Sequence, residues 1–417
     1  MLFLKKIIIS ILAMAALNSQ SLYNGYGLGL IHTTNQISSK GAASAGLIPA
    51  FRKNISLDNP STWQNLKFTT LNSGLSNHQI SLNSGIENGS SELVNVQLIV
   101  PIALKYAFGF SLEPLTVQRT FLRNDSTVTI FDDDSLFTYS EIRSGGGLSV
   151  FTTAFSWPLT NQIQLGLKLE YLFGSSRYEN LFKVNNDNFR AYNQIFYEGL
   201  LFKGYFNGQI LKKEKFNLGI FGSFGITLNE LNAQKYSTQP FEDINNNNIY
   251  DINDYPDSLT RDTLSLINIY KPSQFSLGLN IDLKNGINLI SEIDWLKNGS
   301  QERTDISILP DVIGEKFHLN FGVVKFPFGR LNEWYDRFSY RGGIYHTSHT
   351  LKISGKSINE SGYTLGIGFK FGVAGNQIDF AFKGGNRSIS GNQTEKIKEF
   401  SVGISLGDKW FLRRRTR

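Results

Sequence analysis

The stretch from Asp243 to Asp254 has the side chains of a calcium-binding loop. It reads DINNNNIYDIND and follows the pattern D-x-[DN]-x-[DN]-G-x5-E, with Asn248 in place of the glycine and Asp254 in place of the glutamate. Oxygen ligands at alternate positions suit Ca²⁺, and asparagine can adopt the left-handed conformation that the glycine usually supplies. The predicted ligands are Asp243, Asn245, Asn247, the carbonyl of Ile249, Asp251 and Asp254. The alternative is a solvated Asn/Asp-rich loop that binds no metal.

The other residues that could do chemistry form no catalytic motif. The sequence has no cysteine and five histidines, and it contains no G-x-S-x-G, H-E-x-x-H or Walker-type motif. Because side chains alternate along a strand, His346 and His349 should point to opposite faces, whereas Glu292 and Asp294 should share one. We interpret these two carboxylates as part of a charged barrel lumen rather than as a glycosidase pair. We therefore predict no enzyme, and no cofactor other than calcium.

The segments that carry these residues alternate between apolar and polar side chains. From Ile163 to Phe173 every second residue is apolar, and the residues between include Lys168 and Glu170. Such a strand has one apolar and one polar face. A soluble β-sandwich also alternates, but these strands are long and their polar faces carry charge. A barrel that turns its apolar face to lipid and its polar face to a wet lumen accounts for both features.

About 14 such segments can be counted between residues 66 and 411. Backbone groups in lipid need hydrogen-bond partners, so the sheet should close on itself. Short predicted turns alternate with longer connections, among them 120–145, 177–188 and 232–272. This alternation matches the short periplasmic turns and long outer loops of bacterial barrels. The predicted fold is all-β, a transmembrane antiparallel β-barrel.

The start of the chain predicts export. Residues 1–21 place Lys5 and Lys6 before an apolar core that is too short to cross a bilayer as a helix, which is typical of a secretory signal peptide. Basic residues do not cluster with aromatic ones, so no nucleic-acid partner is expected. We predict the bacterial outer membrane as the location, with lipid and the outer-membrane assembly machinery as partners. The predicted domains are a signal peptide (1–21), an N-terminal plug or hatch segment (22–65), the barrel (66–411) and a basic periplasmic tail (412–417).

Residues 22–65 lack the alternation and resemble a known family. They contain a Gly-rich stretch from Tyr23 to Gly29, small residues from Gly41 to Gly46, and the motif Asn59-Pro60-Ser61. With the Trp410-Phe411 ending, these features resemble the long-chain fatty-acid transporter (FadL-like) outer-membrane family, closest to a divergent Bacteroidota-like branch. The resemblance implies a barrel of about 14 strands plugged by an N-terminal hatch, with hydrophobic ligands that bind inside and leave sideways into the membrane. The family motif ends in alanine where this chain has Ser61.

The sequence therefore predicts passive diffusion of small hydrophobic, fatty-acid-like molecules through a plugged barrel. The alternative is a structural or secretion-associated barrel, similar to type IX secretion components, that binds partner proteins. Binding of a hydrophobic ligand to the purified barrel favours the first prediction, and stable copurification of protein partners favours the second.

The calcium hypothesis makes a direct prediction about the long connection that contains the loop. Ca²⁺ should protect residues 232–272 from protease, because a bound ion cross-links the loop through its oxygen ligands. The double substitution Asp243→Ala/Asp254→Ala should abolish this protection, measured by limited proteolysis with and without chelator. Proteolysis that never depends on Ca²⁺ in the unsubstituted protein would end the hypothesis.

Overall fold

The structure, a computed structural model, describes one sheet and a short N-terminal segment. It covers residues 21–408 apart from 33–35, 83–86, 103–104, 132–133, 161, 186, 239–240, 246–253, 255–261, 284, 302–305, 307–308, 310, 329–333, 373–374 and 390–393. The predicted signal peptide, except for Ser21, and the predicted basic tail therefore lie outside the described residues. No helix in the described part of the chain is long and apolar enough to cross a membrane.

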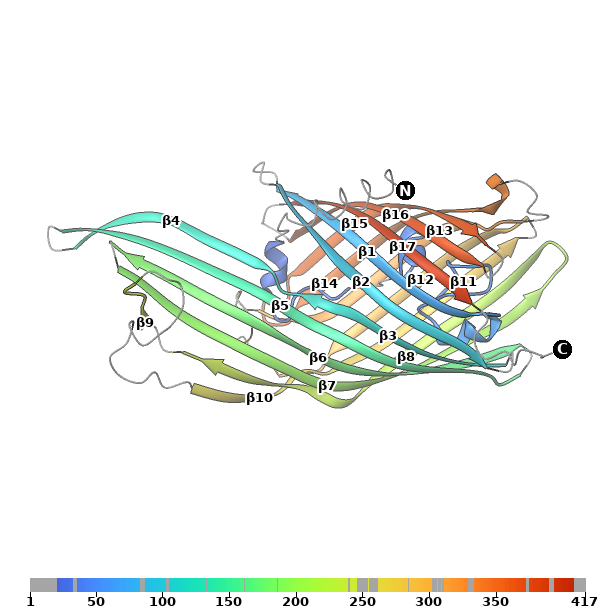
Figure 1. The fold of residues 1–417 in the computed structure, drawn as a ribbon, viewed down its shortest axis with the longest axis horizontal. Coiled ribbons are helices and arrows are strands. Elements are labelled where there is room, and N and C mark those ends of the chain that lie inside the picture. Colours follow the sequence, from blue (N-terminus) through green and yellow to red (C-terminus); the bar gives the residue numbers. More distant parts are fainter. Residues whose placement is uncertain are drawn as a thin grey trace, which may run out of the picture.

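Strands account for most of the chain (Figure 1). They are β1 (Thr69–Leu82), β2 (Glu87–Ile102), β3 (Tyr106–Val117), β4 (Thr120–Phe131), β5 (Asp134–Pro158), β6 (Ile163–Val184), β7 (Asp187–Lys212), β8 (Phe216–Ser237), β9 (Phe241–Glu242), β10 (Asp262–Tyr270), β11 (Pro272–Leu283), β12 (Ile287–Asn298), β13 (Ile313–Lys325), β14 (Phe338–Leu351), β15 (Ser357–Phe371), β16 (Asn376–Ile389) and β17 (Glu395–Asp408).

These strands form a closed antiparallel barrel. The first strand pairs with the last along its whole length, from Thr69 opposite Asp408 to Leu82 opposite Glu395. Because β4 continues β3, β10 continues β11 and β9 has only two residues, the barrel itself has 14 strands. The prediction of an antiparallel barrel with about 14 strands is confirmed. Closure gives the strands in lipid the backbone partners that they need.

The two faces of each strand divide as the alternation predicts. On β11, Phe275 and Leu279 point outward and are exposed, whereas Ser276, Asn280 and Asp282 point inward and are buried. Outward aromatic rings also stack on one another, as Phe155 does with Trp157 and Tyr106. The outside therefore offers an apolar band to lipid, and the lumen is lined with polar and charged groups.

Part of the barrel wall extends well beyond the rest. The strands β5, β6, β7 and β8 have 25, 22, 26 and 22 residues, whereas β11 and β12 have 12 each. With β4, β9 and β10, their far ends form a sheet that we call the outer extension (Figure 1). It lies at the end of the barrel opposite the short turns and the last residue of β17, so it faces the cell exterior.

The outer extension corrects two predicted connections. Residues 120–145 and 177–188 were expected to be loops, but most of them belong to β4, β5, β6 and β7. The reason is that a strand outside the lipid needs no continuous apolar face, so the periodic signal weakens where the strand continues. The sheet bends where the extension begins, and there Gly146 and Gly147 have φ values of 119° and 144°, which favour glycine.

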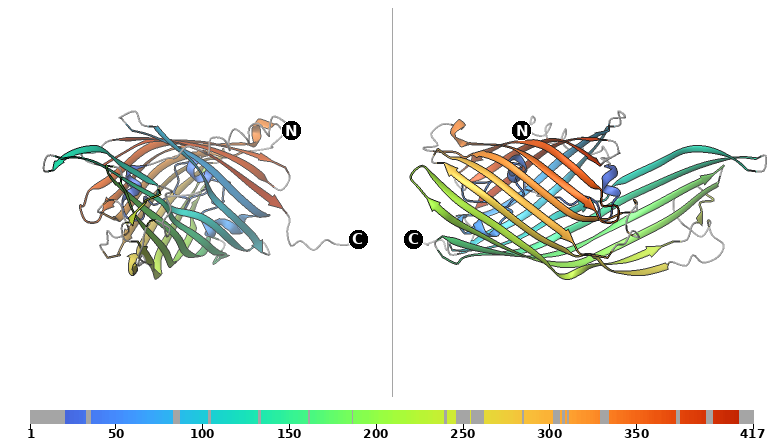
Figure 2. Two further views of the ribbon diagram at one scale, coloured as in Figure 1. Left: turned by 60° about the vertical axis from the view of Figure 1, so that its left-hand side comes forward. Right: turned by 180° about the vertical axis from the view of Figure 1, so that it is seen from behind.

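The N-terminal segment, defined here as residues 21–66, lies inside the barrel (Figure 2). It contains η2 (Leu22–Gly25), α2 (Ile37–Gly41) and η3 (Pro60–Asn65). Helix α2 packs against β15 and β16, and η3 packs against β5 and β6. Where α2 ends, glycines in the wall let the N-terminal segment approach the strand backbone closely. A Cβ at Gly343 would lie 2.7 Å from the Ala42 carbonyl oxygen, and one at Gly366 would lie 2.8 Å from the Cα of Gly41.

This close approach predicts the effect of a side chain at residue 343. Gly343→Val should push the N-terminal segment from the wall while the barrel still closes, because the added atoms meet the backbone of Ala42 and Phe321. Limited proteolysis should then cut within residues 36–48, whereas the heat-modifiable migration of the folded barrel on gels should persist. Gly342→Val is the matched control, since a Cβ there meets its nearest neighbour at 3.7 Å. Equal protease resistance in both variants would contradict the packing.

Candidate functional site: the lumen and a seam in its wall

The N-terminal segment is bound to the lumen by a buried carboxylate. Glu292 on β12 is 1% exposed, and its carboxylate accepts hydrogen bonds from the Ser44 hydroxyl (2.7 Å), the Ile48 backbone N–H (2.6 Å) and the Asn320 side chain (3.2 Å). A fourth contact comes from the backbone N–H of Ala45. These donors replace the water that a carboxylate loses on burial. The prediction that Glu292 faces the lumen is confirmed, and its partners are structural.

Asn59, Pro60 and Ser61, the predicted plug motif, form the start of η3. The Asn59 side chain accepts hydrogen bonds from the Ser61 N–H (3.0 Å) and the Ser61 hydroxyl (2.7 Å), and it donates one to the Leu47 carbonyl (2.8 Å). Asparagine is a preferred helix N-cap residue and proline a preferred first residue. Asn207 on β7 then donates to the Ser61 carbonyl (2.7 Å), which fixes the capped turn to the wall. The serine at this position supplies an extra hydroxyl contact that alanine would lack.

Ion pairs fix the segment at further points that the sequence did not indicate. Arg341 on β14 pairs with Asp379 on β16 at 2.6 Å and donates to the Ala50 carbonyl at 2.8 Å. Lys40 on α2 pairs with Glu399 on β17, and their side chains are 9% and 7% exposed. Each pair joins residues far apart in sequence, so spacing alone could not reveal them. Asp294 likewise faces the lumen, where it pairs with Lys316 at 3.5 Å.

One junction of the barrel wall is incomplete. The ladder between β2 and β3 runs only from Ile102 opposite Tyr106 to Val96 opposite Leu112. Beyond this ladder, β2 keeps only its pairing with β1 on its other edge, and β3 keeps only its pairing with β5. We call this gap the seam. Pro114 lies on β3 just past the last pair, and proline in a strand is a sequence signal for a sheet edge.

The N-terminal segment closes the seam from inside. Ile31 forms an antiparallel bridge with Thr116, and the His32 N–H donates to the Leu115 carbonyl at 3.0 Å. The side chain of Gln118 donates to the Gly27 carbonyl at 2.6 Å. A short extended stretch of the segment thus supplies partners to the edge of β3 that β2 leaves.

A cavity of about 160 Å³ lies behind the seam. Ser90 and Glu92 line it from β2, Val117 and Arg119 from the other side of the seam, and Ile31 from the N-terminal segment. Four of the five histidines also line it: His32, His78, His318 and His349. The polar groups are largely paired, as in the contact of 2.9 Å between His78 Nε2 and Glu92.

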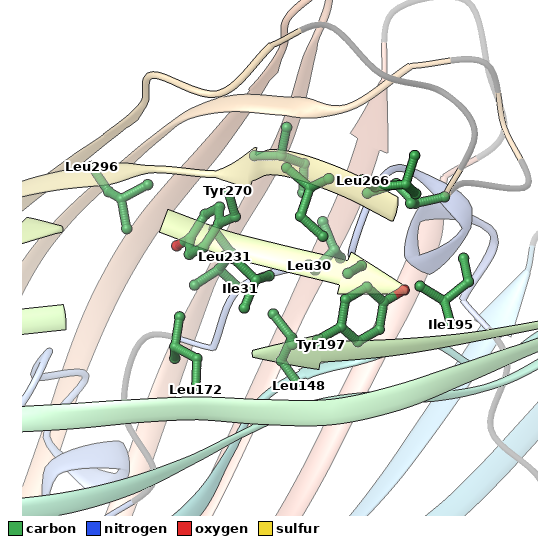
Figure 3. Close-up of a cluster of buried hydrophobic side chains, with 14 of the residues drawn as sticks. Leu30, Ile31, Leu148, Leu172, Ile195, Tyr197, Leu231, Leu266, Tyr270 and Leu296 are labelled. Carbon is green, nitrogen blue, oxygen red and sulfur yellow. The ribbon is translucent and has the colours of Figure 1, made fainter. Parts of the chain in front are cut away.

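An apolar cluster fills the outer part of the lumen. Leu148, Leu172 and Tyr197 on the strands point toward Leu30 and Ile31 of the N-terminal segment (Figure 3). The cluster gives the outer lumen an interior apolar surface.

A loop between β12 and β13 lies against the same segment at the mouth. The Leu309 N–H donates to the Gly25 carbonyl, and the Gly27 N–H donates to the Asp311 carbonyl, both at 3.0 Å. The Asp311 carboxylate accepts hydrogen bonds from the backbone of Ile353 (2.9 Å) and Ser354 (3.0 Å) in the turn after β14. Loop, turn and N-terminal segment are therefore one hydrogen-bonded unit.

The predicted calcium residues are only partly described. Asp243 and Asp254 are both 2% exposed, and the Ile244 N–H donates to Asp254 at 3.1 Å, so the two ends of the predicted loop lie together. Asp243 also pairs with Arg190 on β7 at 3.2 Å, so a cation would share this carboxylate with an arginine. Asn247, Ile249 and Asp251 lie outside the described residues, whereas Asn245 is exposed. Calcium binding stays a prediction.

The histidine pair behaves as expected from strand geometry. His349 is buried on the lumen face of β14, whereas His346 donates to or accepts from the exposed Ser361 hydroxyl at 2.7 Å. The two rings therefore lie on opposite faces, and they share no site.

Comparison with known proteins adds to this geometry. A family model described as BamG matches residues 1–416. The chain belongs to the BamG family. No curated protein matches its sequence. The protein is located in the outer membrane, in agreement with the sequence prediction.

Solved structures with the same fold are outer-membrane channels. A Pseudomonas aeruginosa FadL homologue has a TM-score of 0.58 at 14% identity, over 91% of this chain and 99% of that chain. The CymD monoaromatic hydrocarbon channel has a TM-score of 0.54 at 12% identity, and the Ralstonia pickettii toluene transporter TbuX has 0.54 at 11%; each match covers 93% of this chain and 99% of the other. The predicted resemblance is confirmed for the fold, and these neighbours are not enzymes. The Bacteroidota-like branch stays a prediction.

The mouth of the BamG-family barrel should respond to acid through Asp311. Burial opposes ionisation of this carboxyl, but hydrogen bonds from Ser354, Ile353 and Val312 outweigh it and lower the pKa of Asp311. A lowered pKa stabilises the folded contact above the ordinary carboxyl pKa of about 3.9, and this stability is lost as the pH falls through the lowered value.

Asp311→Asn should therefore speed hydrogen exchange at the amides of Ile353 and Ser354 at neutral pH. The free energy of local opening at these amides should fall by about 1–3 kcal/mol. The difference from the unsubstituted protein should vanish as the pH falls through the lowered pKa of Asp311. A difference that stays constant down to strong acid would contradict the role of the charge.

Proposed function

We propose that the protein is an outer-membrane channel for small hydrophobic molecules, released sideways through the seam. The seam is the observation that carries the proposal. It is a break in the ladder between two neighbouring strands, it has a cavity directly behind it, and among the described residues it is closed by a short stretch of the N-terminal segment.

The order of surfaces along the lumen supports a path for apolar molecules. The outer cluster around Leu148 and Tyr197 is apolar, and Leu30 and Ile31 carry this surface down to the cavity. Ile80, Val117 and Ile397 line the cavity itself. Below the cavity, Glu292 and Arg341 bind the N-terminal segment to the wall, so the segment lies across the route toward the periplasm. A hydrophobic molecule would leave through the seam, where the outward face of the barrel meets lipid.

Release then requires the stretch around Ile31 to leave the edge of β3. Few hydrogen bonds hold it there, and exchanging them for contacts with a ligand costs little compared with opening a full ladder. In this role, the N-terminal segment is both a plug for water and a movable cover for the seam.

A second candidate function is favoured by the outer extension. Phe182 and Phe196, on opposite faces of this sheet, are 46% and 47% exposed. Large apolar groups exposed to water are typical of protein-binding surfaces. A structural or secretion-associated barrel that binds partner proteins would use this surface, and it would need no movement at the seam.

The channel proposal predicts that a disulfide across the closed seam blocks uptake. Residues opposite each other on antiparallel strands have Cα atoms about 4.5–5.5 Å apart, which suits a disulfide. The chain has no cysteine, so Ile31→Cys/Thr116→Cys introduces a single possible bridge. Cells carrying the oxidised variant should lose uptake of radiolabelled oleate and toluene, and reductant should restore it.

Each single-cysteine variant is a matched control and should transport equally under both redox conditions. Uptake that is the same with the bridge formed, verified by mass spectrometry, would rule out release through the seam. An absence of any uptake in the unsubstituted protein would instead favour the protein-binding function.

A further inference from the structure

The outer extension has two edges, and they differ. Its β10 edge is covered where β10 meets β11: the Gln301 N–H donates to the Asn268 carbonyl at 3.2 Å, and the Gly299 N–H donates to the Lys271 carbonyl at 2.9 Å. At the other edge, β4 pairs with β5, from Thr120 opposite Ser144 to Phe131 opposite Asp134. Within the described part of the chain, no strand pairs with the far side of β4.

The β4 edge lacks the features that normally protect a strand from further pairing. Natural edge strands carry lysine or proline, or they are short. Residues 120–131 read TFLRNDSTVTIF, with neither lysine nor proline over 12 residues. Residues 126–131 carry no charge and are rich in β-branched and aromatic types, which favour strand pairing.

The part of this edge that β3 forms already pairs with an extended stretch of the N-terminal segment. β3 and β4 form one continuous edge, since both pair with β5. On the β3 part, Ile31 and His32 of the N-terminal segment add as an antiparallel extended stretch at Thr116 and Leu115. The backbone of this edge is therefore presented in a conformation that a second extended chain can pair with. The backbone pairing of the N-terminal segment ends before β4 begins, although η2 still contacts β4, so the β4 part continues an interface that exists in the fold.

The charge near the base of β4 defines the chemistry of a partner. Arg119 and Arg123 are exposed there, and the Arg143 side chain on β5 is 56% exposed, with its guanidinium over the ring of Phe121. On β5, Glu141 lies opposite Arg123 in register and pairs with Arg143. A strand added on the other side of β4 would meet the guanidinium groups of Arg119 and Arg123, so acidic side chains suit it.

We propose that the β4 edge binds an extended, acidic segment of a second protein at the cell surface, as an added antiparallel strand. Main-chain hydrogen bonds to β4 provide the affinity, and carboxylates of the added strand pair with the arginines at its base. Such strand addition is independent of transport through the seam, which lies below β4 and is closed from inside. Failure of one proposal therefore leaves the other standing.

The test uses a peptide with the sequence of β5, the strand that β4 pairs with on its other side. A fluorescent peptide with the sequence of residues 134–144, DSLFTYSEIRS, contains Glu141 and the β-strand residues of β5. Its binding to the full barrel in detergent is measured by fluorescence anisotropy. The edge variant Thr127→Lys/Thr129→Lys should abolish binding, because lysine protects an edge from pairing. The matched control Thr263→Lys/Ser265→Lys places the same charges on β10 and should bind as the unsubstituted protein does.

Two changes in the peptide test the mechanism. Methylation of alternate backbone nitrogens should abolish binding if main-chain hydrogen bonds carry it. Replacement of the peptide's glutamate by glutamine should weaken binding about two- to five-fold, the range of an exposed ion pair. Heat-modifiable migration on gels shows that each protein variant has folded. Binding that survives in the β4 variant, or no binding of the unmodified peptide to the unsubstituted barrel, overturns the proposal.

Discussion

Backbone groups in lipid have no water to bond with, and this constraint organises the whole molecule. It explains why β1 must pair with β17 and so close the barrel. It also makes the seam a weak point of the wall, because the ladder between β2 and β3 ends early there. There the N-terminal segment supplies the missing partners through Ile31 and His32, so one short stretch completes the wall. A wall completed by a separable segment is also a wall that can open.

The polar lumen is the counterpart of the apolar outside. Glu292, Arg341 and Glu399 would be costly to bury alone, but each meets donors or a counter-charge from the N-terminal segment or a neighbouring strand. Removing one member of such a buried pair generally destabilises a protein by about 3–5 kcal/mol, because the other charge is left without a partner. The contacts therefore specify where the segment lies as much as they stabilise it. The lower lumen is held firmly, whereas the stretch at the seam is held by few bonds.

Alternation along single strands was sufficient to predict the barrel, its approximate strand number and the lumen-facing side of Glu292 and Asp294. It failed beyond the lipid, where residues 120–145 and 177–188 continue as strands without an unbroken apolar face. The pairs Lys40–Glu399 and Arg341–Asp379 could not be predicted either, because strand periodicity gives the face of a residue but not the register between distant segments. The seam had one sequence signal, Pro114, which marks a sheet edge. Resemblance placed Asn59, Pro60 and Ser61 in a motif, and the structure adds that they cap a turn.

The central claim is that the N-terminal segment fills the lumen, and electrical conductance in planar bilayers tests it most directly. The full chain should show a small conductance, because the segment and its ion pairs occupy the barrel interior. A chain that carries its own export signal but lacks residues 22–65 should insert as a folded barrel and conduct far more, since about 14 strands enclose more space than side chains fill. Equal conductance of the two folded barrels would contradict the account.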